Sequence, residues 1–123
     1  MQPGMITPVW CTGSGRALLW DHSEKALQEL LADVEFIGVG GPQAAHSSGE
    51  VLALMERDRP RGVVHAVEEF EHGVHELAVP LRDPAGTIVA SLCVFGERRE
   101  FDGRTAEISA AIEESARRLA ATG

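Results

Sequence analysis

The stretch from Gly73 to Gly96 constrains the fold most, because two β-rich runs flank a turn sequence at residues 83–86. Two such runs on either side of a turn predict an antiparallel hairpin. Centring the turn between Pro84 and Ala85 gives one face that is entirely apolar. Because the side chains on that face would meet across the strands, we expect it to form a core. The expected pairs are Leu81 with Ile88, Val79 with Ala90 and Leu77 with Leu92.

The opposite face of the hairpin is small and semi-polar, and in this register Glu76 lies directly across from Cys93. A helix could cover this face, with Glu76 at the rim because carboxylates usually stay exposed. Alternatively, the face lines a pocket whose single charged group is held on a rigid strand. The sequence leaves both interpretations open. The residues of this face are Val74, Glu76, Ala78, Pro80, Val89, Ser91, Cys93 and Phe95.

Length and composition predict one ordinary globular domain. The chain has 123 residues, of which 44% are hydrophobic and 24% charged, and no apolar run approaches the length of a membrane span. The first residues lack a basic region followed by an apolar stretch, so we expect a cytoplasmic protein. The two cysteines, Cys11 and Cys93, do not form a disulfide framework.

The charge balance argues against direct binding of nucleic acid by this chain. The formal net charge is −8, whereas phosphate contacts need clustered Lys and Arg side chains. The longest basic run, Arg57–Arg61, is interrupted by an acid and a proline, and we expect it to be a solvated helix end. If DNA is involved, another segment must hold it.

A short helix is expected to begin after Thr12, which suits an N-cap position. The free backbone N–H groups around Gly13, Ser14 and Gly15 could seat a carboxylate or a phosphate. The glycines could instead serve only the conformation of the chain. No third glycine follows at the spacing of a dinucleotide-binding fingerprint.

The remaining periodicities predict two more helices, a strand and a terminal helix, giving three antiparallel strands covered on one side by the last helix. A glycine-rich loop is expected between the second and third helices. The expected elements are a helix after Ser23 with Leu27, Leu30 and Leu31 as its apolar stripe, a loop over Val34–Gly49, a helix after Ser47 or Ser48 that stops at Pro60–Gly62, a strand over Val63–Val67, and a helix from Asp102 to about Ala121 with Ile108, Ala111, Ile112, Ser115 and Leu119 on one face.

Three blocks of sequence resemble the effector-binding domain of the IclR family of bacterial transcriptional regulators. They are Thr-Gly-Ser-Gly-Arg-Ala-Leu-Leu at 12–19, Glu-Glu-Phe-Glu-His-Gly-Val at 68–74, and the hairpin sequence at 78–96. The resemblance implies a GAF-like α/β (α+β) domain, in which an antiparallel sheet is flanked by helices. It also implies a small-molecule effector, assembly as a homo-oligomer (dimer or tetramer), and a winged helix-turn-helix placed before the domain.

The sequence departs from the family pattern at its beginning. It contains no winged helix-turn-helix, and it begins at the strand before the first effector-domain helix, so we expect the sheet to be incomplete on its N-terminal side. Residues 1–123 are therefore expected to form a single effector-binding-like domain with no DNA-binding domain in this chain. We expect no membrane partner and no cofactor.

The resemblance also implies where the effector lies. Polar side chains that are common in family members that bind small acids are replaced here by Ala66, Cys93 and Phe95. We expect a partly apolar effector whose polar end meets Glu76 or the helix start, and an amine or hydroxyl group fits beside Glu76 more easily than a carboxylate. The positions carried over are Gly13, Ser14, Ala66, Val74, Glu76, Cys93 and Phe95.

Three other functions remain as alternatives. A zinc site could use His65, His72, His75, Glu76 and Cys93, although their spacing matches no dense ligand motif. A cysteine-dependent enzyme could use Cys11 or Cys93, but neither lies in a nucleophile motif, so we expect no enzyme. A ligand-free oligomerisation module could associate through the terminal helix or through an unpaired sheet edge.

Overall fold

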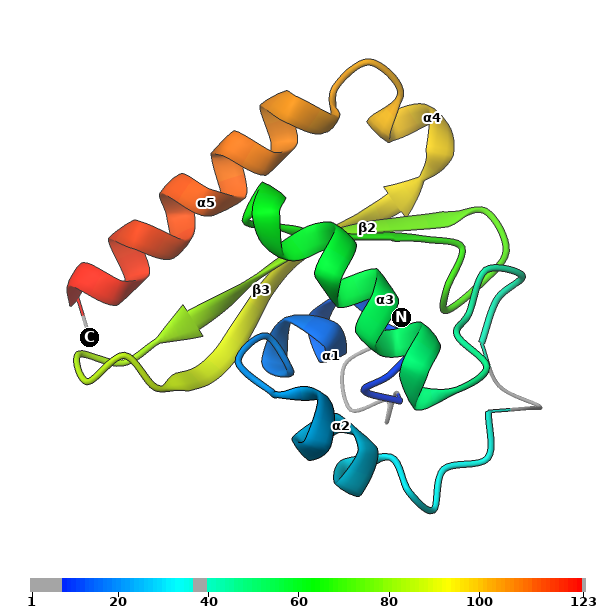
Figure 1. The fold of residues 1–123 in the computed structure, drawn as a ribbon. Helices are drawn as coiled ribbons and strands as arrows, with labels where there is room; N and C mark the ends of the chain where they lie inside the picture. Colours follow the sequence, from blue (N-terminus) through cyan, green and yellow to red (C-terminus); the bar gives the residue numbers. More distant parts are fainter. Residues whose placement is uncertain (1–7, 37–39, 123) are drawn as a thin grey trace.

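The computed structural model describes residues 8–36 and 40–122 and contains a three-stranded antiparallel sheet in the order β1-β2-β3 (Figure 1). Strand β1 spans Val64–Val67, β2 spans Val74–Arg82 and β3 spans Ile88–Glu97. Helices lie on both sides of this sheet. The predicted α+β class and antiparallel order are therefore confirmed.

The register of the β2–β3 hairpin differs from the predicted one by two residues. Val79 pairs with Leu92, because the connection is a loop over residues 83–87 instead of a two-residue turn and because the register shifts once more between Leu81 and Arg82. The backbone N–H of Asp83 donates to the carbonyl of Thr87 at 2.9 Å, and Gly86 has φ of +87°. A shift by two residues keeps every side chain on its predicted face.

One consequence of this register corrects the predicted pair of Glu76 and Cys93. Glu76 lies opposite Phe95, and Cys93 lies opposite Ala78. Val67 lies opposite His75 and Ala66 opposite Glu76 on the other side of β2. Ala66, Glu76 and Phe95 therefore form one row across the three strands.

The apolar face of the sheet is covered by helix α5, which spans Thr105–Thr122. The helix begins three residues after the predicted Asp102, because a short helix, α4 (Arg98–Phe101), precedes it and Asp102 is the C-cap of α4. Leu119 was expected to face inward, but it is 50% exposed. The buried cluster between α5 and the sheet contains Val63, Leu77, Val79, Phe101 and Ile112.

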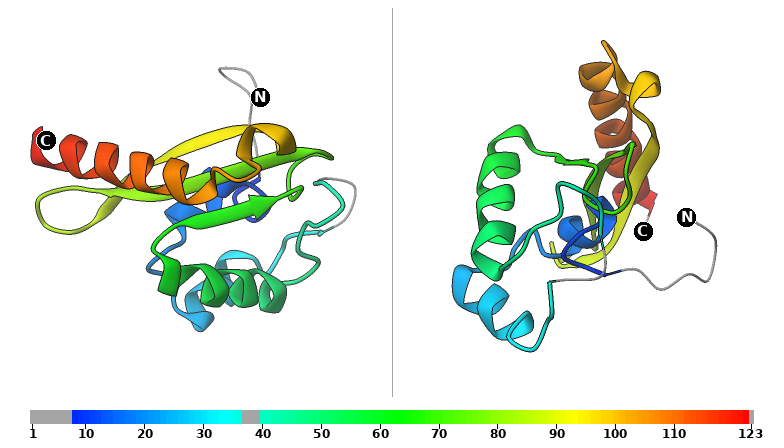
Figure 2. Two further views of the ribbon diagram at one scale, coloured as in Figure 1. Left: turned by 90° about the horizontal axis from the view of Figure 1, so that it is seen from above. Right: turned by 90° about the vertical axis from the view of Figure 1, so that its right-hand side faces the viewer.

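The other face of the sheet is covered by α1, which spans Gly13–Leu18, and beyond α1 lie α2 (Glu24–Leu30) and α3 (Ser48–Asp58) (Figure 2). A short 3-10 turn, η1 (Arg59–Arg61), ends α3. The side chain oxygens of the predicted caps accept backbone N–H bonds at the start of each helix, which confirms the predicted starts. The caps are Thr12, Ser23 and Ser47.

The helices on this side share a second core, made where α2 and α3 pack against the segment that leads into α1. Leu27 and Leu31 are buried there as expected, whereas Leu30 is 50% exposed. The expected loop over Val34–Gly49 separates α2 from α3, although its residues 37–39 lie outside the part that the structure describes. Within the described ranges, no helix has both the length and the apolarity to cross a bilayer.

Candidate functional site

The contact between α1 and β2 brings together two of the predicted site residues. Glu76 is only 1% exposed, and its Oε2 accepts the backbone N–H of Gly13 at 3.0 Å. A Cβ atom added to Gly13 would lie 2.9 Å from the Cβ of Glu76. The start of α1 therefore lies directly on the strand, and only glycine leaves room for Glu76.

The environment of Glu76 disfavours its charged form. Burial raises the pKa of the carboxyl above its ordinary value, and the hydrogen bond from the Gly13 N–H opposes this effect. The negative charge of Glu69 raises the pKa further. The expectation of a helix-covered face is met, but Glu76 lies under the helix and not at its rim.

The predicted site residues gather on this one face, at different depths. Gly13 and Ala66 are buried with Glu76, whereas Ser14 is half-buried and Phe95 is 46% exposed. Small residues make the close packing possible, because Ala17 of α1 meets three residues of the sheet. Those three are Val64, Ala66 and Ala78, with Cys93 partly buried against them.

The more exposed members of the set lie on β2 and β3. Val74 and Cys93 are half-buried, and Phe95 on β3 is the most exposed of the seven. The exposed residues are apolar, whereas the polar Glu76 lies deep. A ligand that approaches from the β3 side would therefore meet apolar surface first.

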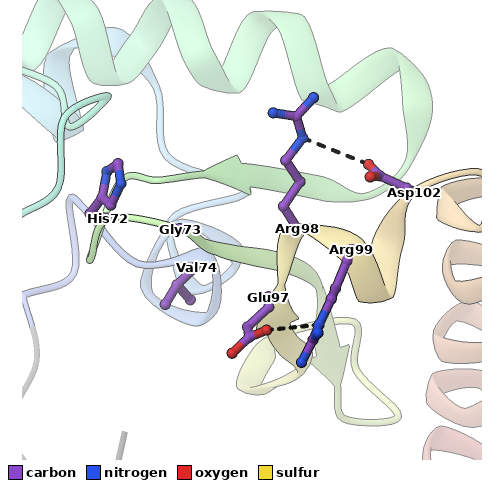
Figure 3. Close-up of a pocket in the computed structure, with 7 residues that line it drawn as sticks. All are labelled: His72, Gly73, Val74, Glu97, Arg98, Arg99 and Asp102. Carbon is purple, nitrogen blue, oxygen red and sulfur yellow. Dashed lines mark ion pairs between the residues drawn. The ribbon is translucent and has the colours of Figure 1, made fainter.

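Val74 also lines a cavity of about 500 Å³ at the end of the hairpin that leads into α4 (Figure 3). Two ion pairs join residues of its lining: Arg99 pairs with Glu97 at 3.0 Å, and Arg98 pairs with Asp102 at 3.9 Å. Figure 3 shows these two pairs on different sides of the strand end. Sequence analysis did not identify this cavity. Its lining residues are His72, Gly73, Val74, Glu97, Arg98, Arg99 and Asp102.

A buried cation next to the site was also missed. Arg16 of α1 is fully buried, and its guanidinium donates to both carboxylate oxygens of Glu69 at 2.8 and 2.9 Å. A third bond, from Nη1 to Asp58 Oδ2, is 2.8 Å long. Arg16 thus joins α1 to the end of α3 and to the turn after β1, and both buried carboxylates have a partner.

The end of α3 is less solvated than its basic sequence predicts. Asp58 is fully buried, and Arg57 also donates to it at 2.9 and 3.1 Å. Burial alone would raise the pKa of Asp58, but the bonds from Arg57 and Arg16 outweigh burial and lower it. Arg59 donates to the carbonyls of Trp20 and His22. The predicted solvated helix end is therefore wrong for this part of the run.

Neither alternative chemistry gains support from the side-chain geometry. His65 and His75 have ring centroids 6.5 Å apart, and the paired register puts them on the apolar face, away from Glu76. The described ranges hold no group of three His, Cys, Asp or Glu residues placed to bind a metal ion. Burial raises the pKa of the Cys11 thiol to about 11 and also raises that of Cys93, which weakens both as nucleophiles.

The description of a known protein family matches nearly the whole chain. The profile described as "Bacterial transcriptional regulator IclR C-terminal" matches residues 2–121. The HTH-type transcriptional regulator KdgR of Escherichia coli is 27% identical over 119 residues, which cover 96% of this chain and 45% of KdgR. This chain therefore spans less than half of that curated relative.

Two solved structures have the same fold. The C-terminal domain of E. coli KdgR gives a TM-score of 0.83 at 26% identity, over 94% of this chain and 70% of that one. A double mutant of the PobR inducer-binding domain from Acinetobacter was solved as a complex with 3-hydroxybenzoic acid. It gives a TM-score of 0.80 at 19% identity, over 93% of this chain and 66% of that one. The PobR likeness concerns the fold alone.

Proposed function

This chain belongs to the family of bacterial transcriptional regulators with an IclR C-terminal domain, and from that premise we propose that it binds a small-molecule effector and transmits the binding to DNA through another segment. The family and the relatives are transcriptional regulators and not enzymes. We propose further that residues 1–123 form a single effector-binding-like domain. The net charge of −8 supports leaving DNA contacts to a separate segment.

The observation that carries the proposal is the semi-polar face under α1. It holds a buried carboxylate, Glu76, next to the backbone of Gly13, and the side chain of Phe95, which lies opposite Glu76 on β3, is 46% exposed. A few polar groups in apolar surroundings are typical of small-molecule sites. The proposed lining residues are Gly13, Ser14, Ala66, Val74, Glu76, Cys93 and Phe95.

The proposed effector has an apolar body and one polar end. The apolar body would lie against Phe95 and Val74, which are accessible, and the polar end would point toward Glu76. The PobR complex offers an aromatic ring with polar substituents as a first scaffold to screen. Such ligands should enter from the side of β3, because α1 closes the face at Gly13.

Isothermal titration calorimetry with a panel of acids, phenols and amines tests this proposal. We expect at least one compound to bind the wild-type chain, and we expect binding to weaken in Phe95→Ala and in Glu76→Gln. Val89→Ala is a matched control for Phe95, because Val89 is 62% exposed on the same strand but outside the proposed site. Unchanged binding in both site variants would show that the site is elsewhere.

A second candidate function is self-association, and the edge of β3 favours it. Among the described residues β3 pairs only with β2, so its other edge has free backbone groups, and Val89 and Phe95 expose apolar surface beside it. Unpaired edges recruit other strands. Light scattering with and without the compounds that bind would separate the two functions, since a ligand-free module would assemble equally in both conditions.

A further inference from the structure

The two edges of the sheet differ in what covers their backbone groups. At the β1 edge, the N–H of His65 donates to Asp58 at 3.3 Å, and the carbonyl of His65 accepts from Arg57 at 2.6 Å. Arg16 donates to the same carbonyl at 3.4 Å. These side chains occupy positions that a further strand would need for its own hydrogen bonds, so the β1 edge is covered at His65.

The β3 edge lacks this cover over Ile88–Gly96. Within residues 8–36 and 40–122, the strand pairs only with β2, and no side chain bonds to the backbone of this run. Figure 2 shows β3 along the outer side of the sheet. The run also contains no charged residue and no proline, which are the residues that commonly prevent pairing at an edge. This edge is therefore open to another strand.

The side chains of β3 are arranged symmetrically about Leu92, the residue at the centre of the uncharged run Ile88–Gly96. Val89 and Phe95, which are 62% and 46% exposed, lie at equal distances along the strand on either side of Leu92. When two copies of β3 pair antiparallel about Leu92, the Val89 of each copy therefore lies opposite the Phe95 of the other, on the same face of the sheet. Moving the centre to the next residue would instead set the charge of Glu97 opposite Val89.

The charges next to the run fit an antiparallel pair of identical strands. At one end, Arg98 and Arg99 are strongly exposed, and Glu97 is paired with Arg99 at 3.0 Å. At the other end, the loop before β3 carries Asp83. Antiparallel pairing sets the arginine end of each copy beside the loop of the other, so Arg98 approaches an opposite charge at both ends of the interface. Identical strands paired in parallel would bring like charges together.

On these grounds we propose that β3 is an interface between two copies of this chain, which pair antiparallel about Leu92 and form one continuous sheet. The proposal goes beyond effector binding. It rests on the second candidate function, self-association, and names the partner and the register of pairing. Because His65 has side-chain partners at the β1 edge, the described part of each copy offers β3 as its open edge, and association stops at two copies.

Sedimentation equilibrium of the 123-residue chain at roughly 1–100 μM tests the proposal. We expect the mass to approach twice the 13.2 kDa of one chain as the concentration rises. Val89→Asp should raise the dissociation constant at least about tenfold, because the dimer contains the contact of Val89 with Phe95 twice. Leu30→Asp is the matched control, since it adds the same charge at a leucine on α2 that is 50% exposed. Circular dichroism should show that both variants are folded.

A second measurement tests the register. In a pair centred on Leu92, Cys93 of each copy lies opposite Ser91 of the other. Ser91→Cys should therefore form a disulfide-linked dimer with the native Cys93 under mild oxidation, as seen on a non-reducing gel. The wild type and Ala85→Cys, which adds an accessible thiol in the loop, should give little of this dimer.

The outcomes separate this inference from effector binding and from self-association in general. A monomer at every concentration would overturn the proposal and self-association together, leave effector binding untouched, and assign the β3 edge to a strand of different sequence. If Val89→Asp weakens the dimer no more than Leu30→Asp does, or if Ala85→Cys crosslinks as readily as Ser91→Cys, this interface is overturned while self-association stands.

Discussion

The two faces of the sheet differ in the kind of side chain that is buried on them. The face under α5 is mostly apolar, and Leu77 and Val79 on it pack against Phe101 and Ile112. The face under α1 packs alanines and Val64 in its buried cluster. It also holds the buried carboxylate of Glu76, which accepts the N–H of Gly13, and the buried guanidinium of Arg16 lies beside it. The first face can tolerate other apolar residues of similar volume, whereas the second depends on particular hydrogen-bond partners.

This difference shows that the two faces are stabilised by different interactions. Burying apolar side chains is favourable without direction, but a buried polar group must find its partner or destabilise the fold. The α1 face has partners for its polar groups at distances of 2.8–3.0 Å. We therefore expect the α5 face to tolerate exchange of one apolar residue for another, and both stability and ligand specificity to depend on particular partners on the α1 face.

The largest expected effect is that of Arg16→Met. The substitution keeps much of the side chain but leaves Asp58 and Glu69 as buried carboxylates without Arg16, so we expect the free energy of unfolding to fall by about 3–5 kcal/mol. Urea denaturation followed by circular dichroism measures this loss. Arg82→Met is the control, because Arg82 pairs with the exposed Asp21 and its loss should cost only about 0–1 kcal/mol. Similar losses in both variants would contradict the comparison of the two faces.

On the apolar face, Leu77→Ala should lower the free energy of unfolding by about 2–5 kcal/mol. Leu77 is fully buried, so truncation removes apolar contacts and leaves a cavity. The same denaturation experiment applies, with Leu30→Ala on the exposed side of α2 as a control expected within about 0.5 kcal/mol. Because no polar partner is lost, Leu77→Met should recover most of the stability.

A smaller loss, about 1–3 kcal/mol, is expected for Gly13→Ala, because the new methyl group would press on Glu76 and push α1 from the sheet. Gly49→Ala in α3 is the matched control. A Cβ at Gly49 meets only the Ser47 hydroxyl at 3.7 Å, and alanine should stabilise this helix by up to about 1 kcal/mol. Thermal denaturation of both variants shows whether their effects have opposite signs.

The smallest expected effect is a pH dependence that belongs to Glu76. Because its pKa in the folded chain lies above the ordinary value of 4.5, the folded state binds this proton more tightly than the unfolded state. The stabilising contribution of the proton is complete below pH 4.5 and is lost as the pH rises through the folded pKa. The stability of the wild type minus that of Glu76→Gln should therefore decrease over this window and then stay level. A difference that increases with pH would show that the pKa is lowered.

Local signals account for what the sequence predicted well. The caps Thr12, Ser23 and Ser47 each act on the backbone three residues ahead, and the alternation of the hairpin assigns its two faces. The hairpin register was missed for two reasons: the Asp83 carboxylate accepts the N–H groups of Ala85 and Thr87 and thereby holds a longer loop, and the pairing shifts again between Leu81 and Arg82. The turn sequence alone does not distinguish this loop from a two-residue turn.

The start of helix α4 carries a capping signal that the sequence prediction did not include. Glu97 and Glu100 form a capping box around the first turn, and this spacing is visible in the sequence. Recognising it would have moved the start of α5 past Asp102. The four-residue length of α4 leaves no periodicity to detect.

Long-range contacts account for the part of the site that was missed. Arg16 meets Asp58 and Glu69 across 42 and 53 residues, and nothing in the local sequence of the three identifies them as partners. The resemblance placed Gly13 and Glu76 in one site, but the hydrogen bond between them depends on how closely α1 approaches β2. Whether the seven proposed residues hold an effector stays a prediction for the titrations described above.

The Arg16 guanidinium has a mechanical consequence. It clamps three parts of the chain, since α1 carries Arg16, α3 ends at Asp58, and the turn after β1 carries Glu69. If α1 rotated about its axis, Asp58 and Glu69 would have to move with it or lose their bonds to Arg16. We therefore expect α1, the end of α3 and this turn to move as one rigid unit. When a ligand binds, we expect the β2–β3 hairpin to change its conformation before this unit does.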